Sequence, residues 1–180
     1  MRTMPQPRMP RSRTCLEPRY EIAPIDLARD VQACIDFRRD MYVTSFGTTQ
    51  GLEAEMGEGN GTYLEALRGK IAQLPEGNVH LWEDGRIVGQ AEMRFIDESP
   101  DVGYVSLIYL VPRRRGRGLA RLLHDHAATV FRARGMRFMR LSVCHSNGRA
   151  IASYRKLGWT AAGERAHPMR PMLVMEFALR

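Results

Sequence analysis

Hydrophobic and polar residues change their period several times along the chain, and these changes mark the expected elements. Alternating or apolar runs of strand length predict strands over residues 19–25, 79–82, 86–95, 103–111, 137–143, 160–165 and 172–179. Helical spacing predicts helices over residues 26–42 and 63–74, from Leu119 to a stop at Gly135, and over 147–157. Asp26 and Thr62 are the expected N-caps of the first two helices.

The helix from Leu119 has the clearest pattern. Its expected inward face comprises Leu119, Leu122, Leu123, His126, Val130 and Phe131. Because it lies between strands 103–111 and 137–143, the three form a parallel, right-handed βαβ unit. An Asp84-Gly85 turn predicts an antiparallel hairpin earlier in the chain. This element order predicts an α/β (α+β) fold with a mixed sheet covered by helices.

Length and composition predict one domain over residues 19–180, preceded by a basic, proline-rich tail over residues 1–18 that we expect to be disordered. The tail has no apolar segment of the kind found in secretory signals. No apolar run reaches the length of about 20 residues that spans a bilayer, so we expect no membrane partner. Three cysteines without metal-like spacing favour a reducing, cytoplasmic location.

The formal net charge of +7 is concentrated in two places. Residues 1–18 contain four arginines and one glutamate, and residues 113–121 contain five arginines. A general nucleic-acid surface spreads its cations along a face and places aromatic residues between them. We therefore expect a local anion site and no nucleic-acid partner, although nucleic-acid binding by the arginine run and the tail remains an alternative.

Gly116 and Gly118 interrupt the arginine run between a strand and a helix. Glycine permits a tight turn that exposes backbone N–H groups, and a helix N-terminus attracts anions. The sequence has no GxxxxGK[ST] loop, and a GxGxxG/A fingerprint fails because Arg121 occupies its last place. These observations exclude both common nucleotide-binding loops.

Two motifs resemble those of the GNAT superfamily of acetyl-CoA-dependent N-acetyltransferases. Its central Q/R-x-x-G-x-G/A motif is matched by Arg115, Gly118 and Ala120, and an overlapping frame runs from Arg113 to Gly118. Its later N-x-x-A-x-x-x-Y-x-x-x-G-F motif is matched by Asn147, Ala150, Tyr154 and Gly158, with Trp159 in the aromatic place. The resemblance covers residues 19–180 and implies a splayed sheet of about seven strands flanked by about four helices.

The resemblance also implies acetyl-CoA as cosubstrate, without a metal. The CoA pyrophosphate would bind at the loop and helix N-terminus formed by Arg115, Gly116, Arg117, Gly118, Leu119, Ala120 and Arg121. The main chain of Ile108, Tyr109 and Leu110 would flank the pantetheine and the thioester carbonyl, where a free N–H stabilises an oxyanion. Asn147 would join the later helix to the cofactor, or serve only as a helix cap.

Tyr154 matches the residue that acts as general acid in the superfamily, with a packed core tyrosine as the alternative. The base is less defined. Glu92 is one candidate, or else a solvent-facing partner of Arg94; His145 is another, and a water chain would serve equally. Ser142 occupies the place where related N-terminal acetyltransferases carry a glutamate, which counts against their mechanism.

The implied reaction is direct attack of a primary amine on acetyl-CoA. The acidic residues Glu53, Glu55 and Glu58, without a balancing cation nearby in sequence, favour a small cationic acceptor. The alternatives are a protein or peptide acceptor and a CoA-binding module without turnover. A homodimer is a further possibility. The cluster His124-Asp125-His126 is not expected to bind a metal, and Cys144 is expected to be inert.

Overall fold

A computed structural model describes residues 18–96 and 99–180, so the expected tail lies almost entirely outside the described residues. The described strands are β1 (Tyr20–Pro24), β2 (Val79–Glu83), β3 (Arg86–Phe95), β4 (Val102–Leu110), β5 (Phe138–Cys144), β6 (Thr160–Arg165) and β7 (Met172–Ala178). The α-helices are α1 (Leu27–Phe46), α2 (Leu52–Met56), α3 (Gly61–Gln73), α4 (Leu119–Ala133) and α5 (Gly148–Lys156). The predicted α/β class, with a mixed sheet covered by helices, is confirmed.

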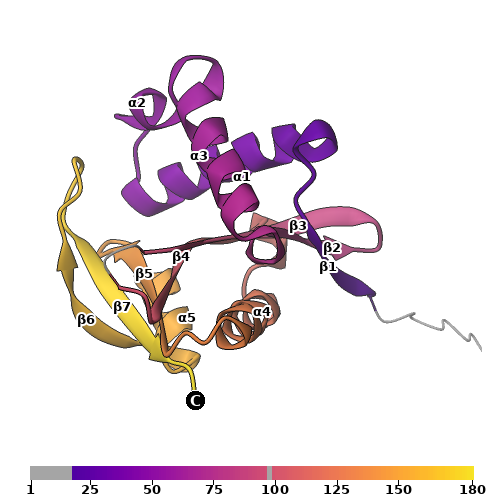
Figure 1. The fold of residues 1–180 in the computed structure, drawn as a ribbon. Helices are drawn as coiled ribbons and strands as arrows, with labels where there is room; N and C mark the ends of the chain where they lie inside the picture. The colour runs from indigo at the N-terminus through magenta and orange to yellow at the C-terminus, as the bar shows by residue number, and fades with distance from the viewer. Residues whose placement is uncertain (1–17, 97–98) are drawn as a thin grey trace, which may run out of the picture.

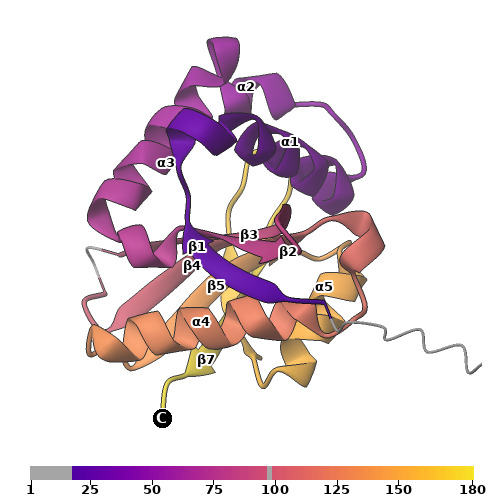
Figure 2. The same cartoon turned by 90° about the vertical axis from the view of Figure 1, so that its right-hand side faces the viewer.

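The strands form one sheet in the order β1-β2-β3-β4-β5-β7-β6. Helices α1, α2 and α3 lie on one side of it, and α4 and α5 lie on the other (Figures 1 and 2). Because both faces are covered, polar side chains on either face of a central strand can be buried. None of the described helices is both long enough and apolar enough to cross a membrane.

Helix α4 packs on the sheet through the face that its sequence predicts. Leu119, Leu123 and Phe131 are buried in the main core, whereas Leu122 remains 38% exposed. His126 is half-buried at the edge of this face, and its Nε2 lies 2.7 Å from the carbonyl oxygen of Glu76. The apolar stripe is therefore narrower than the sequence pattern predicts.

Strands β4 and β5 separate shortly after they pair. Their parallel register covers only Val102–Tyr104 against Phe138–Arg140. On its other side β4 stays paired with β3. Glu92 pairs with Leu107 and Met93 pairs with Val105, so Ser106 is the extra residue of a bulge in β4. A bulge bends the strand that carries it, and the remainder of β4 diverges from β5. The sheet is thus open between two of its central strands.

The first two helices differ from their predicted bounds. Asp26 caps α1 as predicted, with its carboxylate accepting from the Ala28 amide at 3.0 Å. The helix continues beyond the predicted end at Tyr42 to Phe46, where Gly47 ends it in the left-handed conformation. The prediction of Thr62 as a cap is wrong. Helix α3 begins at Gly61, two residues before its predicted start at residue 63, and its N-cap is Asn60. The short helix α2 was not predicted.

Candidate active site

The loop between β4 and α4 presents backbone donors at a helix N-terminus. Gly116 and Gly118 have φ values of 80° and 82°, in the left-handed region that favours glycine. Within the described chain, the amides of residues 116–118 donate to no other group, and the first amides of a helix lack intrahelical partners. These free donors and the helix dipole make the loop suited to an anion such as a phosphate.

The arginine side chains of this loop are engaged mainly in holding it in place. Arg115 donates to the Leu110 carbonyl at 2.8 Å and to the Asp40 carboxylate on α1 at 2.6 Å. Arg114 pairs with Glu83 on β2 at 2.5 Å. The positive charge that the sequence concentrates in this loop is therefore partly neutralised, and Arg115 contributes to the site chiefly by fixing the loop against α1.

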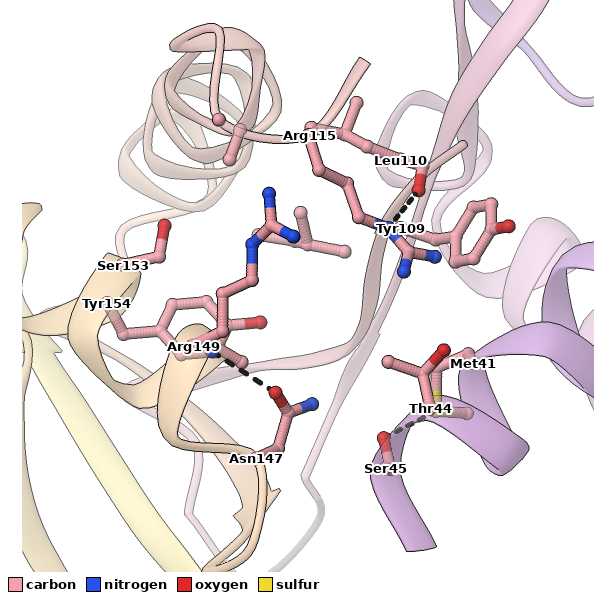
Figure 3. A pocket seen from close by; sticks show the side chains of 14 residues that line it. Met41, Thr44, Ser45, Tyr109, Leu110, Arg115, Asn147, Arg149, Ser153 and Tyr154 are labelled. Carbon is pink, nitrogen blue, oxygen red and sulfur yellow. Dashed lines mark hydrogen bonds between the residues drawn. The ribbon is translucent and has the colours of Figure 1, made fainter. Parts of the chain in front are cut away.

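A first cavity lies below this loop (Figure 3). Met41, Thr44 and Ser45 line it from α1, and the C-terminal end of β4 lines it from above. From α5 come Asn147, Arg149, Ala150, Ser153 and Tyr154. Arg149 extends toward the middle of the cavity (Figure 3), and a Cβ atom at Gly116 would lie 3.4 Å from its Nη2. Its charge thus complements the backbone donors of the loop.

A second cavity occupies the opening between β4 and β5. It is lined by residues 104–108 of β4, residues 141–144 of β5, and side chains from α1, α3 and the segment before β7. It shares Met41, Ser45, Ile108, Asn147, Ala150 and Tyr154 with the first cavity. The two cavities therefore meet in the middle of the split sheet, beside the Tyr154 side chain.

Tyr154 reaches this junction from α5 (Figure 3). Its ring packs against Trp159, with the ring centroids 5.7 Å apart, so it has a packing role as well as a place in both cavities. Burial disfavours the phenolate and raises the pKa of Tyr154 to about 12. The hydroxyl is therefore protonated at neutral pH and able to donate.

Asn147 caps a helix and also lies at both cavities. Its side chain accepts from the Ala150 amide at 3.2 Å and caps α5, and the residue lines both cavities. Of the main-chain segment predicted to flank the cofactor, Ile108, Tyr109 and Leu110 all line the first cavity. Of the predicted loop residues, Arg115, Gly116 and Ala120 line the first cavity, whereas Arg117, Gly118, Leu119 and Arg121 line neither cavity. The structure thus brings together the β4 segment, α5 and part of the loop.

Glu92 does not face solvent, and the interpretation of it as a solvent-facing partner of Arg94 is wrong. Its carboxylate is fully buried and lies 2.6 Å from Nζ of Lys70. Tyr63 and Gln90 each donate to its other oxygen at 2.9 Å. Burial alone would raise the pKa of Glu92, but the charges of Lys70 and Arg38 and the donated hydrogen bonds hold it below its ordinary value. A base with both oxygens occupied is poorly placed to accept a proton.

His145 lies outside both cavities. Its Nε2 is 3.0 Å from a carboxylate oxygen of Glu164 on β6, and about half of the side chain is exposed. His167, which sequence reasoning did not select, lines the second cavity and stacks on Phe46. Its Nδ1 accepts from the Met169 amide at 3.2 Å, so that nitrogen is already engaged.

Sequence reasoning also missed Arg149 and the residues of α1 that close the first cavity. Arg149 occupies an unspecified position of the later motif, between Asn147 and Ala150, and only the structure places it beside the glycine loop. Met41, Thr44 and Ser45 carry no comparable signal because they are remote in sequence from the motifs. Among the described residues, no group of three or more His, Cys, Asp or Glu side chains is placed to hold a metal ion.

The split sheet, the glycine loop at a helix N-terminus and the paired cavities define a site for a long ligand with phosphate at one end. The sequence model of the Acetyltransferase (GNAT) family matches residues 46–159. The chain belongs to this family.

Individual relatives match more weakly. Streptothricin acetyltransferase of Streptomyces lavendulae is 39% identical over 56 residues, which are 31% of this chain and 30% of that protein. The match thus spans less than a third of the curated relative. The structure of nourseothricin acetyltransferase is 25% identical, with a TM-score of 0.53 over 57% of this chain and 65% of its own. The PaiA N-acetyltransferase of Thermoplasma acidophilum, solved with coenzyme A, has a TM-score of 0.72 at 17% identity, covering 89% of this chain and 99% of its own. This last similarity concerns the fold alone.

Proposed function

We propose that the protein transfers the acetyl group of acetyl-CoA to the primary amine of a small molecule. The observation that carries the proposal is the meeting of two cavities at Tyr154, one below the glycine loop and one in the opening between β4 and β5. Membership of the family supports it, as do the names of the streptothricin and nourseothricin acetyltransferases.

The first cavity would hold CoA. Its pyrophosphate would bind the free amides of residues 116–118, with Arg149 adding a positive charge at the same place. The edge of β4 that faces the opening is unpaired with β5 beyond Tyr104, and its main-chain groups can bond to the amides of the pantetheine arm. Arg115 and Asp40 keep the loop fixed against α1 while the ligand binds.

When bound, acetyl-CoA supplies a thioester carbon, to which the amine nitrogen bonds while the carbon–sulfur bond breaks. Tyr154 stands where the cavities meet, and its protonated hydroxyl donates to the departing sulfur. An N–H group of β4 near Ile108 stabilises negative charge on the carbonyl oxygen. The amine proton leaves through water in the second cavity, because Glu92 is enclosed by its partners and His145 is remote.

Two of the three glutamates on which the expected cationic acceptor rests are neutralised within the protein. Glu53 pairs with Arg39 at 2.9 Å, and Glu55 pairs with Arg38 at 2.5 Å. Both arginines come from α1, which is remote in sequence from the glutamates. The charge of the acceptor therefore has to be inferred from the second cavity itself.

The experiment is incubation with acetyl-CoA and a panel of amines, followed by free-thiol release and the product mass. Gly118→Leu is expected to abolish both turnover and the rise in Tm caused by CoA, because a side chain there enters the ligand's path. Gly135→Leu is the matched control: Gly135 follows the other end of α4, has a φ of 75° and is likewise in open space. Equal loss of the CoA effect in both variants would contradict the assignment of the loop.

A further inference from the structure

The second cavity is rich in positive charge. Its lining includes the cationic side chains of Arg38, Lys70, Arg94 and Arg165, and the carboxylate of Glu55. Such a lining attracts anions and repels ammonium groups. This charge comes from four different elements or their ends, α1, α3, β3 and β6, and no local run in the sequence reveals it.

Two of the four cations are neutralised within the protein. Arg38 pairs with Glu55 at 2.5 Å, and Lys70 pairs with Glu92 at 2.6 Å. Arg94 and Arg165 take part in no ion pair among residues 18–96 and 99–180. Within the described part of the chain, two guanidinium charges in the cavity lining are therefore not balanced by a carboxylate.

Among the described residues, Arg94 is held in position by an aromatic ring and a carbonyl oxygen. Its guanidinium lies 4.6 Å from the ring centroid of Tyr104 and donates to the Phe95 carbonyl at 3.3 Å. Tyr104 is in turn fixed by donating to Ser142 across the split sheet at 2.8 Å. A guanidinium stacked on an aromatic ring keeps its remaining N–H groups available for a planar acceptor such as a carboxylate.

Two further polar atoms of this lining lack a partner. Nε of Arg38 and Oγ of Ser106 are buried and make no hydrogen bond within the described residues, and both residues line the second cavity. Buried donors without acceptors are costly, and a ligand oxygen in the cavity would satisfy them. Nε of Arg38 needs an acceptor, and the hydroxyl of Ser106 can donate to one, so an acceptor-rich, negatively charged group fits this lining.

This charge is separate from the place expected for the CoA phosphates. Tyr104 lies six residues before the end of β4 at Leu110, a distance of about 20 Å along an extended strand, and the glycine loop follows that end. A phosphate at the loop is therefore remote from Arg94. The anion that fits the second cavity belongs to the other substrate.

We propose that the acceptor is a primary amine that also carries a carboxylate, as an amino acid does. The inference rests on the proposed acetyl transfer. The amine would lie at the junction beside Tyr154, and the carboxylate would point along the opening toward Arg94, Arg165 and the free donors of Arg38 and Ser106.

The test compares acceptors that differ in one group. Methionine is paired with methioninamide, and 5-aminopentanoate with 5-aminopentanamide and 1,5-diaminopentane. In at least one series kcat/KM for the carboxylate is expected to exceed that of its amide by roughly tenfold or more, the effect of a charge-assisted hydrogen bond. Arg94→Gln and Arg165→Gln are expected to lower kcat/KM for the carboxylate more than for its amide, so that the ratio between the two falls toward one. Arg137→Gln is the control, because Arg137 is 72% exposed and lies outside both cavities.

A binding readout separates this inference from the proposed function. With CoA present, the preferred carboxylate should raise the Tm of the wild type and of Arg137→Gln, and not that of Arg94→Gln. If no amine is acetylated but this Tm pattern holds, acetyl transfer is refuted and the anion site stands. If amides or the diamine react as well as the carboxylates, or if no carboxylate is either acetylated or able to raise the Tm, the inference is overturned.

Discussion

Lys70→Met is expected to destabilise the protein, because it leaves the Glu92 carboxylate buried without its counter-charge. Glu92 has no exposed surface, and Nζ of Lys70 lies 2.6 Å from its Oε2. Methionine keeps most of the aliphatic volume of lysine and removes only the ammonium group. The substitution therefore isolates the ion pair from the packing of α3 on the sheet.

Breaking a buried ion pair by removing one partner costs about 3–5 kcal/mol. Tyr63 and Gln90 still donate to Oε1 in the variant, and the positive charge of Arg38 remains nearby. We therefore expect the lower end of that range, about 3 kcal/mol. For a chain of this size the corresponding fall in Tm is about 6–12 °C.

The loss is expected to depend on pH with a defined sign. In the wild type the folded state lowers the pKa of Glu92. The stability that Glu92 contributes is therefore present above its pKa in the unfolded chain, and it is lost as the pH falls through its pKa in the folded protein. In Lys70→Met burial would raise the pKa of Glu92 above its unfolded value, so stability is lost as pH rises. The gap between the two proteins should widen from about pH 4 to about pH 7.

Urea unfolding at pH 5 and pH 7 measures this gap. Glu92→Gln combined with Lys70→Met removes both charges, and the double variant should be more stable at pH 7 than Lys70→Met alone. A loss below about 1 kcal/mol at pH 7, the scale of a surface pair, would refute the reasoning. A gap that does not change with pH would refute it as well.

Two further predictions concern the cavities. Tyr154→Phe should lower kcat and leave the CoA-induced rise in Tm nearly intact, because only the hydroxyl is lost; unchanged kcat would restrict Tyr154 to packing on Trp159. Asp40→Asn should weaken CoA binding about twofold to fivefold, since a half-exposed ion pair contributes less than about 1 kcal/mol. Asp40 holds Arg115 at 2.6 Å, and calorimetry with CoA measures the change; unaltered affinity would show that this pair does not position the loop.

Elements with local signals can be predicted from the sequence alone. The apolar stripe from Leu119 predicted α4, and the Asp84-Gly85 turn, with φ values of 48° and 78°, predicted the hairpin of β2 and β3. The two motifs at the glycine loop and α5 indicated the family. These signals are readable because each depends on neighbours within a few residues.

Contacts between remote segments were decided only by the tertiary structure. The charge of Glu55 is cancelled by Arg38, and that of Arg115 by Asp40, across long stretches of chain. Local charge counts therefore overstate the net charge of both the acidic segment and the arginine run. The cationic lining of the second cavity is likewise assembled from elements that are separate in sequence.

Glu92 illustrates the physical reason. Strand alternation predicts which side chains share a face of β3, but it does not predict which element covers that face. Helix α3 covers it and supplies Tyr63 and Lys70, so a carboxylate that alternation allowed to face solvent is fully buried. Period and spacing are properties of the backbone and its near neighbours, whereas burial and charge pairing depend on which distant elements pack against them.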